Sequence, residues 1–372
     1  MRILHVIDQL SQKTAGGSAR VCYQLAAAEA RAGHEVVIYT TDYHFDRDFV
    51  KPAKVEVRAF HCLLNFMGGI RLSPSIVFVE FREFDIIHLH NYRTAINIFA
   101  RWMGEPWVMQ AQGSAHGGGS SIVKPVSDRV WTPTIRQANG LLALNDTEAK
   151  QYIAEGADPS KIKIMPIGID LKEFTNLPTK ANNGIKRIVY LGRLHYNKGI
   201  DLLIDAFSEP EIQNNAVLDI YGVDDGDYRR LVMLANKKDV VDRISFKGGI
   251  YGREKVEMLR QADVLVMPSR YEAWGLSFME ALACGTPVIM TRNCEAAEVL
   301  PSYCGRVVDF DSASLAFALK DILYRETDRD FWKKSSEMRR EWVSQFDWDI
   351  LVPQYIKVYQ EAKADFGEQY HF

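Results

Sequence analysis

The sequence lacks the cysteine patterns that cross-link a fold or hold a structural metal. It contains five cysteines, which are scattered along the chain: Cys22, Cys62, Cys284, Cys294 and Cys304. Their number is odd and no two of them form a C-x-x-C pair. This excludes a disulfide framework and a zinc cluster as the basis of the fold. The usage is typical of a reducing compartment, and we expect a cytoplasmic protein.

Long apolar runs and a one-sided charge are also missing. No apolar run approaches the ~20 residues that span a bilayer. The N-terminus enters a strand pattern at Ile3–Ile7 without an apolar signal region. The formal net charge is -3, so there is no excess of Lys and Arg that would favour nucleic acid as a partner.

Motifs for metals and for dinucleotides are equally scarce. There is no H-E-x-x-H, and no G-x-G-x-x-G follows the first strand, which argues against a metalloprotease and a dehydrogenase. The spacing D-x-D occurs five times, at Asp46/Asp48, Asp225/Asp227, Asp309/Asp311, Asp328/Asp330 and Asp347/Asp349. A spacing so frequent in one chain is not specific, and most instances are typical of turns and helix caps. We therefore expect no metal and no cofactor.

What the sequence does contain is an alternation of short apolar strands with helical stripes over 372 residues. The strands predicted in the first half are Ile3–Ile7, Val36–Thr40, Val55–Phe60, Ile86–His90, Trp107–Gln110, Leu141–Leu144 and Ile162–Met165. Those in the second half are Arg187–Leu191, Val217–Tyr221, Ile244–Lys247, Val264–Met267, Val288–Met290 and Arg306–Val308. Such alternation predicts α/β domains with parallel sheets covered by helices on both faces.

The length and the pattern predict two Rossmann-like, doubly wound domains that face each other across a cleft. The polar, turn-rich segment 175–186 divides them as a linker. We expect an N-terminal domain at 1–174, a C-terminal domain at 187–345, and a last helix within 346–372 that packs back toward the N-terminal domain. Ligands of such sheets bind at the carboxyl ends of strands, so the loops there are the candidate sites.

Two glutamates follow the predicted strand Val264–Met267. Glu280 falls on the apolar stripe of a helix that starts near Gly275, and burying a carboxylate is costly unless a partner satisfies it. Either a backbone amide or an arginine binds it, or it accepts hydrogen bonds from sugar hydroxyls, as carboxylates do for a ribose. Glu272 precedes the helix, where backbone N–H groups favour an anion.

Two cations follow the first strand of the second half. Arg193 and Lys198 flank the turn that begins at Gly192, a residue that lets backbone approach a ligand. In the absence of a metal, such cations can stabilise a diphosphate leaving group. The alternative is a pair of solvated surface charges.

The first half offers weaker candidates. Gly16-Gly17 precedes the first helix, and such a turn can be purely structural. His90, Asn91, Gln112 and Gly113 lie at strand ends. We expect at most one of His88 and His90 to face the site and favour His90, the alternative being a core histidine.

Taken together, these segments resemble a known family. P-S-R-Y-E-A-W-G-L-S-F-M-E-A-L-A-C-G-T-P-V-I, from Pro268, and G-R-L-x-x-x-K-G, from Gly192, are similar to motifs of retaining glycosyltransferases of family four with the GT-B fold. The resemblance implies that Glu280 holds a ribose, that Glu272 lies by the donor sugar, and that Arg193 and Lys198 clamp the diphosphate. Further donor contacts that it implies are Gly16, Gly17, Gly192, Gly222, Gly249, Ile250, Tyr251, Ala273, Trp274, Gly275 and Leu276. Gln112 stands where the family often has a histidine, and Gln cannot act as an acid or base.

The expected activity is transfer of a hexose-type sugar from a nucleoside-diphosphate sugar to a glycan or lipid-linked acceptor, independent of metal. Retention of the anomeric configuration follows if Gln112 cannot serve as a base and Glu272 binds hydroxyls rather than attacking. A nucleotide-sugar 2-epimerase of the same fold and a non-catalytic nucleotide-sugar-binding relative are the alternatives. The apolar segment 63–81 is either a buried helix with its loop or a surface that meets a membrane.

Overall fold

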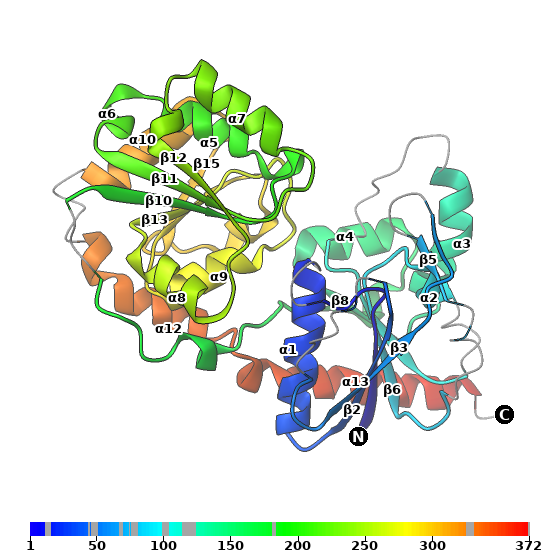
Figure 1. The fold of residues 1–372 in the computed structure, drawn as a ribbon. Coiled ribbons are helices and arrows are strands. Elements are labelled where there is room, and N and C mark those ends of the chain that lie inside the picture. Colours follow the sequence, from blue (N-terminus) through cyan, green and yellow to red (C-terminus); the bar gives the residue numbers. More distant parts are fainter. Residues whose placement is uncertain are drawn as a thin grey trace. The chain divides into compact units, whose positions relative to one another are not determined.

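The computed structural model describes residues 1–11, 16–43, 45, 51–66, 70–73, 75, 81–98, 104–113, 124–180, 184–324 and 331–370. Its internal contacts divide the chain into two units (Figure 1). Unit 1 comprises Met1–Gly168 and Phe346–Phe372, and unit 2 comprises Ile169–Gln345. Each unit is built on one parallel sheet, as the alternating pattern predicts.

Unit 1 holds a seven-stranded sheet in the order β3-β2-β1-β6-β7-β8-β9. The strands, in that order, are Val55–Phe60, Glu35–Thr41, Arg2–Val6, Ile86–His90, Trp107–Gln110, Gly140–Ala143 and Ile162–Ile164. All neighbours pair in parallel. The direction in which the chain adds strands reverses between β1 and β6, which makes this the topological switch point of the sheet.

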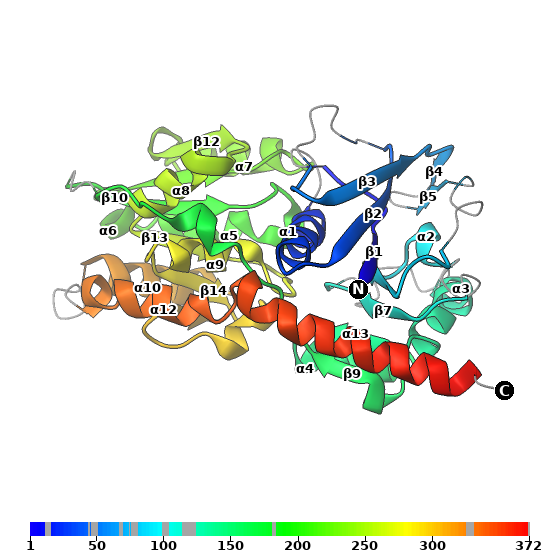
Figure 2. The ribbon, with the colours of Figure 1, turned by 90° about the horizontal axis from the view of Figure 1, so that it is seen from below.

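Both faces of this sheet are buried, and the strand period of two explains why. On β2, Val36 and Ile38 enter one apolar cluster, whereas Val37 and Tyr39 enter another on the opposite face. The helices that cover the faces of the sheet are α1 (Gly17–Arg31), α2 (Ala95–Ile98), α3 (Lys124–Arg136), α4 (Asp146–Ala154) and α13 (Trp348–Tyr370). Helix α13, from the end of the chain, packs on α1, β7 and β8 (Figure 2).

Unit 2 holds a six-stranded parallel sheet in the order β12-β11-β10-β13-β14-β15. The strands, in that order, are Ile244–Gly248, Ala216–Tyr221, Lys186–Leu191, Val264–Met267, Val288–Thr291 and Gly305–Val308. The switch point lies between β10 and β13, which pair directly. A ligand of this sheet is therefore expected beyond the carboxyl ends of β10 and β13.

Helices cover both faces of the second sheet as well (Figure 1). One face carries α5 (Ile200–Phe207), α6 (Pro210–Gln213), α7 (Tyr228–Lys237) and α10 (Ser312–Tyr324). The other carries α8 (Gly252–Gln261), α9 (Leu276–Ala283) and α12 (Ser336–Ser344). No helix within the described part of the chain is long and apolar enough to cross a membrane.

The expected linker at 175–186 is part of unit 2 where the structure describes it. The backbone carbonyls of Thr175 and Asn176 accept hydrogen bonds from Arg253 at 3.1 and 2.6 Å. The carbonyl of Pro178 accepts one from Arg260 at 3.2 Å. Helix α8 therefore holds the backbone of this segment, although the segment has few apolar side chains. The boundary between the two units lies between residues 168 and 169.

The prediction of a buried helix within 63–81 is wrong for the described part of that segment. β4 (Leu64–Phe66) and β5 (Ile70–Leu72) pair instead as a two-stranded antiparallel sheet. Leu63 and Leu64 are 60% and 50% exposed, so neither side chain lies in a core. Residues 67–69, 74 and 76–80 lie outside the described part.

Candidate functional site

An ion pair joins the two loops that flank the switch point of unit 2. Lys198 lies in the loop after β10, Glu272 lies in the loop after β13, and Nζ of Lys198 bonds Oε2 of Glu272. The two side chains are 20% and 19% exposed, so the pair is partly shielded from water without being sealed from it. The structure thus brings together a cation and a carboxylate that the sequence predicts separately as site residues.

The backbone forces these loops into contact. Gly199 has φ +64°, and a Cβ atom there would lie 1.8 Å from the carbonyl oxygen of Pro268. Such an approach is open only to glycine, which also adopts positive φ without strain. The N–H of Arg270 then donates to the carbonyl of Asn197 at 2.8 Å. Backbone contact therefore fixes the positions from which Lys198 and Glu272 meet.

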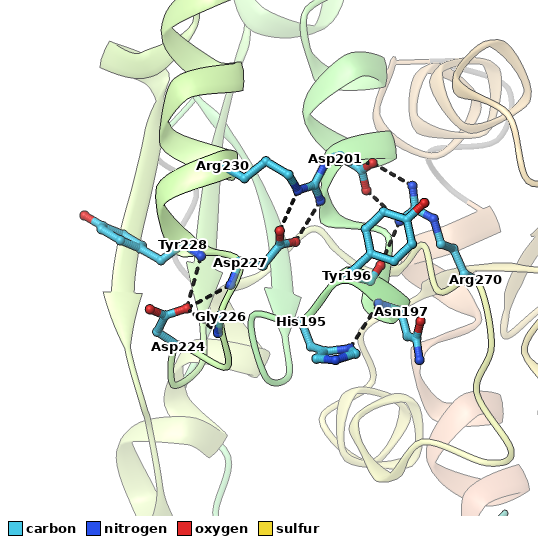
Figure 3. Close-up of polar contacts among 10 residues, drawn as sticks. All are labelled: His195, Tyr196, Asn197, Asp201, Asp224, Gly226, Asp227, Tyr228, Arg230 and Arg270. Carbon is cyan, nitrogen blue, oxygen red and sulfur yellow. Dashed lines mark hydrogen bonds and ion pairs between the residues drawn. The ribbon is translucent and has the colours of Figure 1, made fainter. Parts of the chain in front are cut away.

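A charged cluster braces the same two loops and was missed by the sequence analysis (Figure 3). Arg270 donates to the two carboxylate oxygens of Asp201 at 2.8 and 2.6 Å, and to the carbonyl of Tyr196 at 2.8 Å. Its guanidinium lies over the Tyr196 ring at 4.0 Å. Arg230 reaches Asp201 at 3.2 Å and binds Asp227 through two bonds. The cluster ties the start of α5 to the loop before it, to the loop after β13 and to the start of α7.

Charge complementarity within this cluster is strong. Burial alone would raise the pKa of Asp201, but the hydrogen bonds from Arg270 and Arg230 outweigh burial and hold it below its ordinary value. The same bonds raise the pKa of Arg270. No sequence motif predicts this cluster, because its members come from three separate elements.

Arg193 lies in a more exposed position than Lys198. Its Nη1 bonds Oδ2 of Asp225 at 2.6 Å, and the two side chains are 53% and 40% exposed. The turn that carries it packs against the next one, since a Cβ on Gly222 would lie 1.7 Å from the carbonyl oxygen of Gly192. The backbone of Gly192 therefore lies against Gly222, and its approach to a ligand stays a prediction.

Glu280 is held by a lysine, a partner that the structural alternative of an arginine or a backbone amide does not name. Its Oε1 bonds Nζ of Lys255, on α8, at 2.7 Å, with the side chains 5% and 7% exposed. Burial, and after it the charge of Glu280, raises the pKa of nearby Cys284 to about 12. The pair joins α9 to α8, the helix that follows three of the predicted donor contacts.

Those residues, Gly249 to Tyr251, end the turn between β12 and α8. Tyr251 is 50% exposed and stands immediately before α8. In the loop before α9, by contrast, the side chains of Ala273 and Trp274 are buried, and Gly275 caps the helix with φ +82°. The buried side chains anchor this loop, and the donor contacts that the resemblance implies for Ala273 to Leu276 stay a prediction.

In unit 1, Gly16 and Gly17 begin α1. A Cβ at Gly16 would meet nothing within 4 Å, so sterics do not require glycine there. Residues 12–15 of the same loop lie outside the described part. Asn91 and Gln112 lie at the ends of β6 and β7 with φ +62° and +53°, in the left-handed region that few side chains adopt.

The expectation that His88 and His90 face opposite ways is wrong. Residues two apart on a strand share a face, and the two rings stack at 4.2 Å. Both are fully buried. His90 bonds the side chain of Gln112 at 3.0 Å, so it acts behind Gln112 instead of lining the surface itself.

Neutralising Asp201 should loosen the two loops that its charged cluster braces. We expect Asp201→Asn to lower the melting temperature and to speed amide exchange at 193–199 and 268–272, because a charge-assisted hydrogen bond contributes about 1.5–3 kcal/mol. Hydrogen exchange measured by mass spectrometry checks this. The matched control is Asp205→Asn on the same helix, which breaks a surface pair with Lys238 worth about 0–1 kcal/mol. Equal exchange in both variants would contradict the bracing role.

Comparison with known proteins agrees with this geometry. Residues 173–339 match the family described as Glycosyl transferases group 1, and residues 16–168 match the Glycosyl transferase 4-like domain. The gpi3 subunit of phosphatidylinositol N-acetylglucosaminyltransferase from Schizosaccharomyces pombe is 24% identical over 94% of this chain and 78% of its own. Sucrose-phosphate synthase from Thermosynechococcus elongatus shares the fold with a TM-score of 0.78 at 22% identity, over 98% of this chain and 99% of its own. HepE from Anabaena, solved with UDP and glucose, gives 0.76 at 17%, over 97% and 99%. The chain therefore belongs to the group 1 glycosyltransferases and has their GT-B fold.

Proposed function

We propose that this enzyme transfers a hexose-type sugar from a nucleoside-diphosphate sugar to a hydroxyl of a glycan or lipid-linked acceptor, with retention of configuration and without a metal. The observation that carries the proposal is the pair of Lys198 and Glu272 at the switch point of unit 2. The UDP bound to HepE supports a uridine donor. The phosphatidylinositol in the name of the gpi3 relative supports a lipid-linked acceptor.

The chemistry demands cations at the leaving group. As the bond from the anomeric carbon to the diphosphate breaks, negative charge grows on the phosphate oxygen. Lys198 and Arg193 are each bound to one carboxylate, Glu272 and Asp225. Because both cations remain partly exposed, a diphosphate can compete for them. They would supply the stabilisation that a divalent ion supplies elsewhere.

The position of Glu272 favours a hydroxyl-binding role over attack. A carboxylate bonded to an ammonium group is a weakened nucleophile, and its free lone pairs still accept hydrogen bonds. Gln112 offers no titratable base. The acceptor would then attack on the face that the diphosphate leaves, with a phosphate oxygen taking its proton.

The leaving-group role predicts a loss of turnover. Lys198→Met and Arg193→Met should lower kcat more than they raise the donor KM, because the charge they stabilise is greatest in the transition state. The measurement is release of nucleoside diphosphate from UDP-glucose and GDP-mannose, with and without acceptors, in the presence of EDTA. Lys238→Met, which breaks a surface pair, is the control. Activity that EDTA abolishes and Mn²⁺ restores would overturn the assignment, and an altered sugar still joined to its nucleotide would indicate epimerisation.

The ribose role of Glu280 predicts weaker nucleotide binding. Glu280→Gln should raise the Kd for UDP or GDP by about tenfold or more, because a bond to a charged acceptor contributes about 1.5–3 kcal/mol. Calorimetry on folded protein measures this. Lys255→Met is the matched variant, since it breaks the same buried pair while keeping the carboxylate. Equal loss of thermal stability in both, with unchanged nucleotide affinity, would show that Glu280 is purely structural.

Retention predicts the configuration of the product. An α-linked donor of gluco or galacto configuration should give an α-glycoside, because attack and departure share one face. The anomeric proton coupling of the first-formed product, read by NMR, decides the point. A large β-type coupling from an α donor would refute the same-face route while leaving sugar transfer intact.

A further inference from the structure

A buried chain of hydrogen bonds runs through unit 1 behind Gln112. Its Nε2 lies 3.0 Å from Nδ1 of His90, whose Nε2 lies 2.9 Å from Nδ1 of His5. Nε2 of His5 lies 2.6 Å from Glu29 on α1, and the other oxygen of Glu29 lies 2.9 Å from the Tyr359 hydroxyl on α13. The side chains of His5, His90, Glu29 and Tyr359 are fully buried. The chain therefore links a strand-end residue to the last helix of the protein.

One assignment of donors and acceptors satisfies every bond of this chain. A carboxylate only accepts, so His5 donates to Glu29 through Nε2–H. When His5 carries one proton, its Nδ1 accepts from His90. Complete burial is the main cause that holds the pKa of His90 well below its ordinary value, so the His90 ring carries one proton. That proton is on Nε2, which leaves Nδ1 of His90 to accept. Gln112 must therefore turn its NH₂ group toward His90.

A second anchor fixes the same orientation independently. The amide nitrogen of Gln110 lies 3.4 Å from the carbonyl oxygen of Met165, which can only accept. The amide oxygen of Gln110 consequently faces Gln112 and accepts from its Nε2 at 3.3 Å. Both N–H bonds of the Gln112 amide are thus committed to the protein.

The backbone of this loop is also held on both sides. The N–H of Ala111 donates to the Tyr152 hydroxyl at 2.8 Å, and the N–H of Gly113 donates to Glu148 at 2.7 Å. Within the described part of the chain, Oε1 of Gln112 is buried and has no hydrogen-bond partner. A buried acceptor without a partner is unfavourable, and a hydroxyl donor would remove that cost.

We propose that this network positions Gln112 so that its amide oxygen accepts a hydrogen bond from a sugar hydroxyl, with His90, His5, Glu29 and Tyr359 as positioning residues. The proposal rests on the proposed sugar transfer and deepens it. In this arrangement Gln112 accepts a hydrogen bond from the sugar and does not donate one. It also makes α13 a support of the sugar site, because the hydroxyl of Tyr359 holds Glu29.

A metal is the competing interpretation of the same cluster. His5, Cys22 and His90 present ligand atoms within 4.8 Å of one another. The hydrogen bond between the His5 and His90 rings, however, places a proton between their two nitrogens. A metal bound to both rings would need a free lone pair on each of these nitrogens. Burial and the charge of Glu29 also raise the pKa of the Cys22 thiol well above its ordinary value, whereas a metal binds the thiolate.

The first experiment needs no substrate. Nitrogen-15 NMR of the full-length protein, assigned with single histidine variants, reports the tautomer of each ring. We expect Nε2–H on His5 and His90, and Nδ1–H on His88, which donates to Tyr359 at 2.8 Å. A proton on Nδ1 of His90, or one equivalent of zinc by mass spectrometry of the purified protein, would overturn the proposal even if sugar transfer stands.

The second experiment separates positioning from packing. With UDP-glucose or GDP-mannose, Tyr359→Phe should lower kcat/KM about threefold to tenfold while leaving UDP or GDP affinity unchanged. Tyr39→Phe, which removes another buried hydroxyl of unit 1 that accepts from Arg58 at 3.1 Å, should change neither. In a Gln112→Met background the effect of Tyr359→Phe should vanish, because non-additivity marks residues that act through one another. Additive losses would contradict the proposal, and if neither donor is turned over the tautomers still decide it.

Discussion

The arrangement of the candidate site in unit 2 depends on one backbone contact, the approach of Gly199 to the carbonyl of Pro268. A side chain at residue 199 would push the loops after β10 and β13 apart, and Lys198 would no longer meet Glu272. Because parallel strands end at the same edge, the sheet brings the two loops near each other. The glycine then closes the remaining distance, and the bonds of Arg270 to Asp201 hold it closed. Geometry at this site is set by main chain first and by charge second.

The strands could be predicted from sequence because both sheets are buried on both faces, which turns each strand into a short continuous apolar run. The strand order could not, since it is a property of distant pairings. For this reason the sequence marks Lys198 and Glu272 as loop residues but does not show that they flank a switch point. Lys255 was missed for a similar reason: it lies on an ordinary amphipathic helix, and only the packing of α8 on α9 gives it Glu280 as a partner.

Two failures have local causes. The segment at 63–81 is rich in apolar residues, and composition without a clear period does not separate helix from strand. Its described part pairs as β4 and β5, a short antiparallel sheet. The histidine error concerned periodicity itself, since His88 and His90 are two residues apart and must share a face. Correct use of the strand period would have predicted the stacked, buried pair, although not the bond of His88 to Tyr359 on a helix more than half the chain away.

The two units differ in the exposure of these polar groups, and the proposed reaction would account for the difference. In unit 2 the ion pair of Lys198 with Glu272 is one-fifth exposed, so a ligand can exchange for one partner at little cost in desolvation. A diphosphate whose charge changes during the reaction requires such adjustable partners. In unit 1 the side chains behind Gln112 are fully buried and bonded to one another. Such a network cannot follow a changing charge, but it can hold one amide in one orientation, which is what recognition of an uncharged sugar hydroxyl requires.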